Sequence, residues 1–173
     1  MRLPSLEPGQ RVVLRVAAQP HSIDVIGFVL ADTGDAVTVR DQHGVEHQVS
    51  RDQVLVWRQV GVARGRDPRR TPRDELDRLA AASGLVGRCF VARISDLLGD
   101  QLRPPGAVDD PPPVPATLEG EWVSTADASA LLDLAWWATQ RGARSVQVRT
   151  NDASVAAELA ELGFTELADP ERS

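Results

Sequence analysis

The chain has 173 residues, of which 42% are hydrophobic and 25% charged, and this length suits one ordinary domain or two small ones. Its formal net charge of −6 argues against bulk nucleic-acid binding, because neutralising phosphates needs a basic surface. The single cysteine, Cys89, excludes a disulfide framework within the chain, and no apolar run is typical of a secretory leader or a membrane span. We therefore expect a cytoplasmic protein that does not enter a membrane.

The first sixty residues consist of short runs in which β-branched or aromatic residues alternate with polar ones, as in strands with one buried face. Turn sequences at 32–35 and 42–44 separate some of these runs and carry glycine where a positive φ is expected. The predicted strands are 11–17, 24–31, 36–41, 46–50 and 54–60. This pattern predicts a small SH3-like β-barrel over residues 1–60.

Residues 61–73 are interpreted as an arginine-rich linker. Its five arginines are Arg64, Arg66, Arg69, Arg70 and Arg73, with Asp67 among them. Such a run either binds an anionic partner, such as RNA, DNA or the phosphates of coenzyme A, or is a solvated connection between domains. Gly65 and Pro68 interrupt any regular face on which the charges would line up, so the sequence favours the solvated linker.

A helix is predicted to begin with Thr71 as N-cap and Pro72 in the first helical position, and to end at Gly84. A strand is expected at 89–94. The proline density of residues 101–116 forbids both a helix and a central strand, which predicts an extended loop there. Residues 118–124 form a further candidate strand.

Residues 128–164 indicate a helix, a strand and a second helix in immediate succession. Apolar residues at helical spacing predict a first helix that Arg141 and Gly142 end. Alternation over 145–150 then predicts a strand with one buried face, formed by Val146 and Val148.

The second helix is expected over residues 153–162. Asp152 is its predicted N-cap, because its carboxylate can accept hydrogen bonds from the free amides of the first turn. Gly163 is expected to take the left-handed conformation just past the helix, and Phe164 to fold back onto Leu159.

The order of these elements, with Arg-Gly-Ala-Arg at 141–144, Asn151-Asp152 and Leu162-Gly163-Phe164, resembles the C-terminal half of the GNAT acyltransferase superfamily. Residues 24–60 are similar to the small SH3-like domain that precedes the GNAT domain in a group of actinobacterial acetyltransferases. The resemblance implies an α/β (α+β) protein with a truncated, degenerate GNAT-like domain over residues 74–173. It also implies transfer of an acetyl group from acetyl-CoA to an amine.

The residues that would hold acetyl-CoA depart from the pattern of this family. GNAT enzymes bind the pyrophosphate on the amides of a loop that needs glycine, whereas residues 122–129 contain neither glycine nor arginine. Ser124 and Thr125 are the candidate cofactor contacts there, but Asp127 adds a negative charge where the phosphates would lie. Asn151 is either a further cofactor contact or part of the helix cap.

No catalytic residue can be assigned. Many GNAT enzymes use a tyrosine to protonate the leaving thiolate, but this chain has no tyrosine, and Leu159 falls at that position. We therefore expect impaired or absent acetyl transfer and doubtful binding of acetyl-CoA. No metal site is expected, since His43 and His47 lie in a predicted hairpin and Cys89 lies in an apolar strand.

An alternative hypothesis is a non-catalytic binding or regulatory module. In that case, the SH3-like barrel and residues 64–73 engage a partner protein, and the GNAT-like half is a dimerisation scaffold. A shortened sheet exposes edges that a partner chain would cover, which makes a homodimer a reasonable expectation. Nucleic-acid binding through the same arginines ranks last because the whole chain is acidic.

Overall fold

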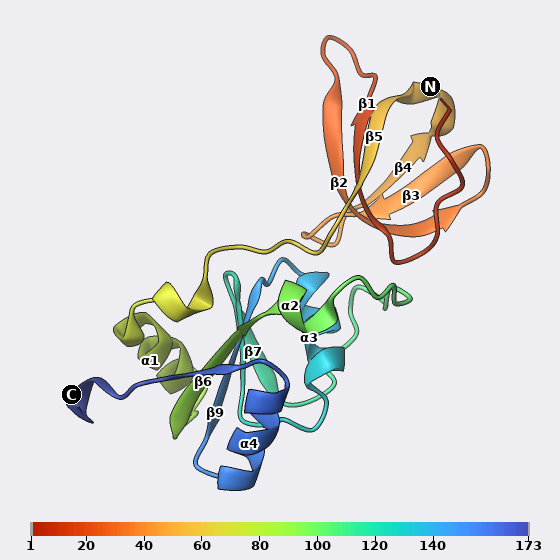
Figure 1. The fold of residues 1–173 in the computed structure, drawn as a ribbon. Helices are drawn as coiled ribbons and strands as arrows, with labels where there is room; N and C mark the ends of the chain where they lie inside the picture. Colours follow the sequence, from red (N-terminus) through yellow and green to blue (C-terminus); the bar gives the residue numbers. More distant parts are fainter. Residues whose placement is uncertain (1, 173) are drawn as a thin grey trace. The chain divides into compact units, whose positions relative to one another are not determined.

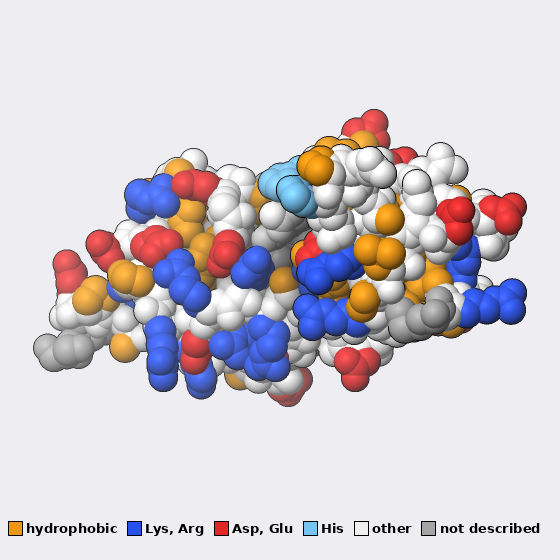
Figure 2. Space-filling model, turned by 90° about the horizontal axis from the view of Figure 1, so that it is seen from above, with side chains coloured by type: hydrophobic (Ala, Val, Ile, Leu, Met, Phe, Trp, Pro, Cys, Tyr) orange, Lys and Arg blue, Asp and Glu red, His pale blue; other side chains and the backbone are white. Residues whose placement is uncertain are grey.

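The computed structural model describes residues 2–172, which divide into two compact units (Figure 1). Unit 1 contains the residues up to Val62 and the separate segment Asp100–Asp110, and unit 2 contains Ala63–Gly99 and the residues from Pro111 onward. Each unit is built on one five-stranded sheet, so the expected mixed α+β class is confirmed. On the face shown in Figure 2, acidic and basic side chains are interspersed.

Unit 1 is a sheet of five antiparallel strands in the order β4-β3-β2-β1-β5. The strands are β1 Arg11–Val16, β2 Ile23–Asp32, β3 Ala36–Arg40, β4 Glu46–Ser50 and β5 Val54–Val60, with the 3-10 turn η1 Arg51–Gln53 before β5. All five predicted strands are therefore confirmed to within a few residues. Since β4 and β5 are the edge strands of the described sheet, the sheet does not close into a barrel.

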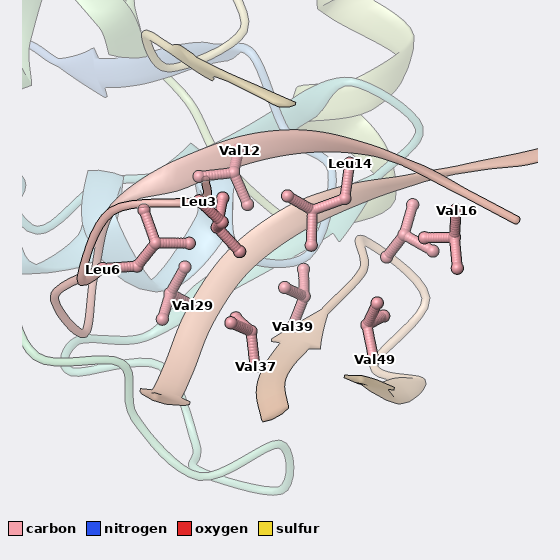
Figure 3. Close-up of a cluster of buried hydrophobic side chains, with 10 residues drawn as sticks. Leu3, Leu6, Val12, Leu14, Val16, Val29, Val37, Val39 and Val49 are labelled. Atoms are coloured by element: carbon pink, nitrogen blue, oxygen red, sulfur yellow. The ribbon is translucent and has the colours of Figure 1, made fainter. Parts of the chain in front are cut away.

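Alternating residues of these strands form the core of unit 1 (Figure 3). The buried side chains are Leu3, Leu6, Val12, Leu14, Val16, Val25, Val29, Val37, Val39 and Val49. Two of them, Leu3 and Leu6, precede the first strand, and the guanidinium of Arg51 holds their segment by donating to the carbonyls of Leu3 and Pro4. The residues before β1 are therefore part of the fold.

Unit 2 has the sheet order β10-β6-β9-β8-β7. Its strands are β6 Arg88–Arg93, β7 Ala116–Glu119, β8 Trp122–Thr125, β9 Ser145–Thr150 and β10 Thr165–Leu167. Its helices are α1 Arg73–Ala82, α2 Ile94–Leu98, α3 Leu131–Thr139 and α4 Ala153–Glu161, with the 3-10 turns η2 Pro68–Arg70 and η3 Pro170–Arg172. The pair β8 and β9 is parallel, and α3 connects its two strands.

The start of α1 corrects the predicted N-cap. Asp67 caps the preceding turn η2 by accepting the amide of Arg69, and Thr71 ends that turn by donating its amide to the Pro68 carbonyl at 3.2 Å. Pro72 is then the N-cap of α1, without a side-chain hydrogen bond. The prediction that Thr71 caps this helix is therefore wrong.

Residues 116–125 form a hairpin and not the single strand predicted at 118–124. Gly120, with a φ of 57°, makes the turn between β7 and β8. The short elements α2 and β10 were not predicted either. The end of α4 agrees with the sequence, because Gly163 has a φ of 96° and the Phe164 amide donates to the Leu159 carbonyl at 2.9 Å.

Strand β9 is buried on both faces, which corrects the prediction of a single buried face. Val146 and Val148 are fully buried, but Gln147 is equally buried and Arg149 is only 5% exposed. The Arg149 guanidinium donates to Gln147 Oε1 at 2.6 Å and to Asp77 Oδ1 of α1 at 2.8 Å. Leu76 and Leu79 of α1 pack in the same cluster as Cys89 and Val91 of β6. Helix α1 therefore covers the face of β9 that carries Gln147 and Arg149, which the alternating sequence pattern had predicted to be exposed.

Candidate functional site

A pocket of about 580 Å³ lies where the parallel strand β8 ends and helices α3 and α4 begin. It is lined by Leu85, Pro115, Ala126, Asp127, Ala128, Ser129, Val155 and Glu158. In open α/β sheets, ligands bind beyond the carboxyl ends of parallel strands. This pocket is therefore the leading candidate for a ligand site. The β8–α3 loop, residues 126–130, supplies half of the lining.

Two backbone amides of the β8–α3 loop donate hydrogen bonds to nearby side chains of the same chain. The Asp127 amide donates to Thr125 Oγ1 at 2.9 Å, and the Ser129 amide donates to Asp127 Oδ1 at 2.9 Å. The Ser129 hydroxyl donates to the same carboxylate oxygen at 2.6 Å. A diphosphate held on backbone amides needs such groups free and turned toward it, so this loop lacks the open cradle that the cofactor requires.

The charge of the pocket also opposes a phosphate ligand. Hydrogen bonds from the Ser129 hydroxyl and amide lower the pKa of Asp127, which keeps its carboxylate ionised at neutral pH. Glu158 is the other charged residue of the lining. At an effective dielectric constant of about 20, two like charges about 4 Å apart repel by about 4 kcal/mol before solvent screening. An anionic cofactor is therefore disfavoured here.

The structure does not bring the three candidate cofactor contacts into one site. Thr125 is fully buried and its hydroxyl donates to the Pro115 carbonyl at 2.7 Å. Ser124 is also buried and accepts a hydrogen bond from Gln147 Nε2 at 3.2 Å. Asn151 lines a different pocket, of about 570 Å³, beside Arg73, Arg88 and Glu166.

Both arginines of this second pocket form hydrogen bonds and salt bridges with other residues of the chain. Arg73 donates to the carbonyls of Leu167 and Ala168 and pairs with Asp77. Arg88 pairs with Glu166 through two hydrogen bonds of 2.6 and 2.7 Å. Asn151 precedes Asp152, whose carboxylate accepts the amides of Ser154 and Val155 and so caps α4 as predicted.

Within the predicted linker 61–73, the residues from Ala63 onward, which include all five arginines, belong to unit 2. Pro68 is buried and η2 packs against β6. Arg93 Nε donates to the Arg66 carbonyl at 3.5 Å, and a Cβ at Gly65 would meet the side chain of Arg144 at 2.8 Å. The segment therefore gathers arginines that are far apart in the sequence. We name Arg64, Arg66, Arg69, Arg93 and Arg144 the arginine surface.

Three carboxylates partly neutralise the arginine surface. Asp67 pairs with Arg69 at 2.8 Å, while Asp96 and Glu121 lie 3.9 and 3.5 Å from Arg64 and Arg144. Five arginines against three carboxylates leave an excess of positive charge in a protein whose net charge is −6.

The remaining reactive groups give no site. Burial raises the pKa of the Cys89 thiol, and its Sγ donates to Gln147 Oε1 at 3.6 Å, so little of the reactive thiolate forms at neutral pH. His47 pairs with Asp41 at 2.8 Å. No group of three potential ligands among the described residues is arranged to hold a metal ion. Within residues 2–172, no helix combines the length and apolar character that crossing a membrane requires.

Comparison of the chain with protein-family models, curated proteins and solved structures gives no match. The amides of Asp127 and Ser129 are hydrogen-bonded within the chain and the pocket beside them is acidic, whereas Arg64, Arg66 and Arg69 of the arginine surface are exposed.

Proposed function

We propose that this chain is a non-catalytic binding module built from an SH3-like unit and a shortened GNAT-like unit, and that its arginine surface binds an acidic segment of a partner protein. The five consecutive antiparallel strands of unit 1 support the SH3-like part. The parallel pair β8 and β9, with α3 between its strands and α4 after it, supports the GNAT-like part. The capped loop amides argue against acetyl-CoA as the ligand.

The arginine surface is the observation that carries this proposal. Arg64 and Arg66 are exposed, and the side chain of Arg69 is 62% exposed although it pairs with Asp67. Arg66 forms no salt bridge with a carboxylate among the described residues, so its charge is available to an anion. Guanidinium groups bind carboxylates through paired N–H donors, which suits aspartate and glutamate side chains.

An acidic protein segment fits the arginine surface better than a nucleic acid does. The excess charge is local and small, and the whole protein is acidic, so a long polyanion would be repelled outside the surface. A short acidic segment meets only the local positive field, because surface charges are screened beyond about 8 to 10 Å at physiological salt.

The test measures binding of a fluorescent oligo-glutamate peptide to the full chain by anisotropy. We expect saturable binding that weakens as salt is raised from about 50 to about 300 mM. The double charge reversal Arg64→Glu and Arg66→Glu removes two attractions and adds two repulsions of about 0.3 to 0.5 kcal/mol each. It should therefore weaken binding roughly tenfold.

The matched control is Arg78→Glu, which reverses an equally exposed arginine on α1 that pairs with Glu119. It changes the net charge in the same direction and should leave peptide binding within about twofold of the unchanged chain. One reversal changes the net charge half as much as two, so a loss of about threefold in Arg78→Glu would show that only net charge matters and would overturn the proposal. Tighter binding of an oligonucleotide than of the peptide would assign the surface to nucleic acid instead.

A further inference from the structure

Most of the proline-rich loop predicted at 101–116 is part of unit 1 and is not a solvated linker. Residues 100–110, which we name the strap, belong to unit 1, although Gly99 before them and Pro111 after them belong to unit 2. The strap contains no helix or strand and includes Pro104, Pro105 and Gly106. An extended segment that belongs to unit 1 while both of its flanking segments belong to unit 2 needs a surface within unit 1 that receives it.

Three positions of the strap touch three separate places on the sheet of unit 1. The Arg103 carbonyl lies against Gly9, where any Cβ would overlap it. The Gly106 carbonyl accepts a hydrogen bond from Arg40 Nη1 at 2.6 Å. The Val108 side chain lies against Gly44, where a Cβ would meet Val108 Cγ2 at 2.6 Å. The strap therefore crosses the turn before β1, the end of β3 and the turn between β3 and β4.

The receiving surface is suited to an extended backbone. Gly9 and Gly44 have φ values of 90° and 80°, so both turns place glycine, with no side chain, under the strap. Arg40 is held in place from its other side by Glu46, to which its Nη2 donates at 3.1 Å. Its Nη1 is thereby aimed at a carbonyl. The contacts of Gly9 and Arg40 are to backbone carbonyls, of Arg103 and Gly106, which any extended peptide can offer.

Arg40, which donates to the strap, leaves one of its own buried N–H groups without a hydrogen bond. The side chain of Arg40 is only 12% exposed, and its Nε has no hydrogen-bond partner among the described residues. A buried N–H without a partner opposes the gain from the bond to Gly106. The strap is also tethered to the chain at both ends, which gives it a high effective concentration at this surface and favours it over a free peptide.

We propose that this surface of unit 1 is a binding site for an extended, proline-containing peptide, and that the strap is its exchangeable intramolecular occupant. A free peptide binds the same surface when the strap is removed. This proposal is independent of the arginine surface, which lies on unit 2.

The experiment uses the full chain with residues 103–108 replaced by glycine and serine, at unchanged length. The probe is a fluorescent peptide with the sequence of residues 100–110. We expect saturable binding to this strap-replaced chain and binding at least roughly tenfold weaker to the unchanged chain, because a tethered strap competes at millimolar effective concentration. Arg40→Gln in the strap-replaced chain should weaken binding several-fold, whereas Arg15→Gln, which loses only the pair with Asp24, should not.

Equal binding to the two chains, or none to a folded strap-replaced chain, overturns the proposal. If the strap-replaced chain does not fold, hydrogen exchange on the Arg40→Gln variant decides the question. Exchange of the strap amides should then accelerate while β1 to β3 keep their protection. Unchanged strap exchange, or simultaneous loss of protection throughout unit 1, contradicts an exchangeable occupant.

Discussion

At the scale of single residues, Asp32 organises the part of unit 1 that lies before β1. Its carboxylate accepts the amides of Leu6 and Gly34 at 2.8 and 2.9 Å and pairs with Arg51 at 2.7 Å. Burial alone would raise the pKa of Asp32, but these donors outweigh burial and lower it. A carboxyl whose pKa is lower in the folded chain than in the unfolded chain stabilises the fold above its unfolded pKa.

We therefore predict that the stability of unit 1 falls as the pH drops below the ordinary aspartate pKa of about 4, toward the lowered pKa of Asp32. Asp32→Asn should lower the free energy of unfolding by about 2 kcal/mol at pH 7, because it removes the charge from three hydrogen bonds. The loss should be smaller at acid pH. Urea unfolding at pH 7 and pH 3 measures both effects. Asp35→Asn, an exposed control, should be nearly neutral, and an equal loss at both pH values contradicts the charge argument.

Arg149 has the corresponding role in unit 2. It is buried within the sheet and joins Gln147 of its own strand to Asp77 of α1. Removing one partner of a buried polar network leaves the others unsatisfied. The residue therefore fixes how α1 lies on β9.

Arg149→Met should cost about 3 kcal/mol of unfolding free energy, because the apolar chain fills the space but satisfies neither Gln147 nor Asp77. The control is Arg88→Met, whose exposed pair with Glu166 should contribute no more than about 1 kcal/mol. Chemical denaturation of both variants gives the comparison. Similar losses in the two would mean that Arg149 acts as a surface charge.

At the scale of elements, the N-cap of α4 is the feature that sequence and structure agree on most closely. Asp152→Ala should destabilise the chain by about 1 kcal/mol, because the amides of Ser154 and Val155 lose their acceptor. Asp152→Ser should keep most of the stability. Melting temperatures of the two variants test this, and an equal effect of both substitutions would exclude a capping role.

Local patterns predicted the strands of unit 1, α3, β9 and α4 because each has several residues of clear periodicity or a recognisable cap. Local patterns did not predict features that depend on contacts with residues far away in the sequence. Thr71 looks like an N-cap, but Asp67 and Pro68 first build a 3-10 turn that ends at Thr71. The second buried face of β9 exists because α1, more than sixty residues earlier, packs on it. Elements as short as β10 and α2 carry too few residues to show a period.

In the candidate site too, local features were predicted from the sequence and features that depend on distant contacts were not. The lack of glycine and the charge of Asp127 are visible in residues 122–129 and predict a poor phosphate cradle. The hydrogen bond of Thr125 to Pro115 and its burial depend on the hairpin of β7 and β8, which the sequence did not predict. Arg93 and Arg144 joined the arginine surface only through the folding of the sheet. No local signal connects them to residues 64–69.

At the scale of the whole molecule, charge is distributed unevenly. The chain is acidic overall, with a net charge of −6, yet its arginine surface on unit 2 has positive charge in excess. Association through that surface should therefore depend on salt, while the stability of the two cores, which are apolar, should depend on it little. Homodimerisation and cytoplasmic localisation stay predictions.

In the loop after β8 the amides of Asp127 and Ser129 are hydrogen-bonded to side chains of Thr125 and Asp127, and we predict that this loop does not receive a diphosphate. Titrating the ¹⁵N-labelled chain with coenzyme A, while following the amides of Asp127 and Ser129, tests it most directly. We predict no saturable shift of either amide up to about 1 mM ligand, the concentration at which even a weak site would fill. Saturable shifts of both amides at micromolar coenzyme A, with a rise in melting temperature, would contradict the claim.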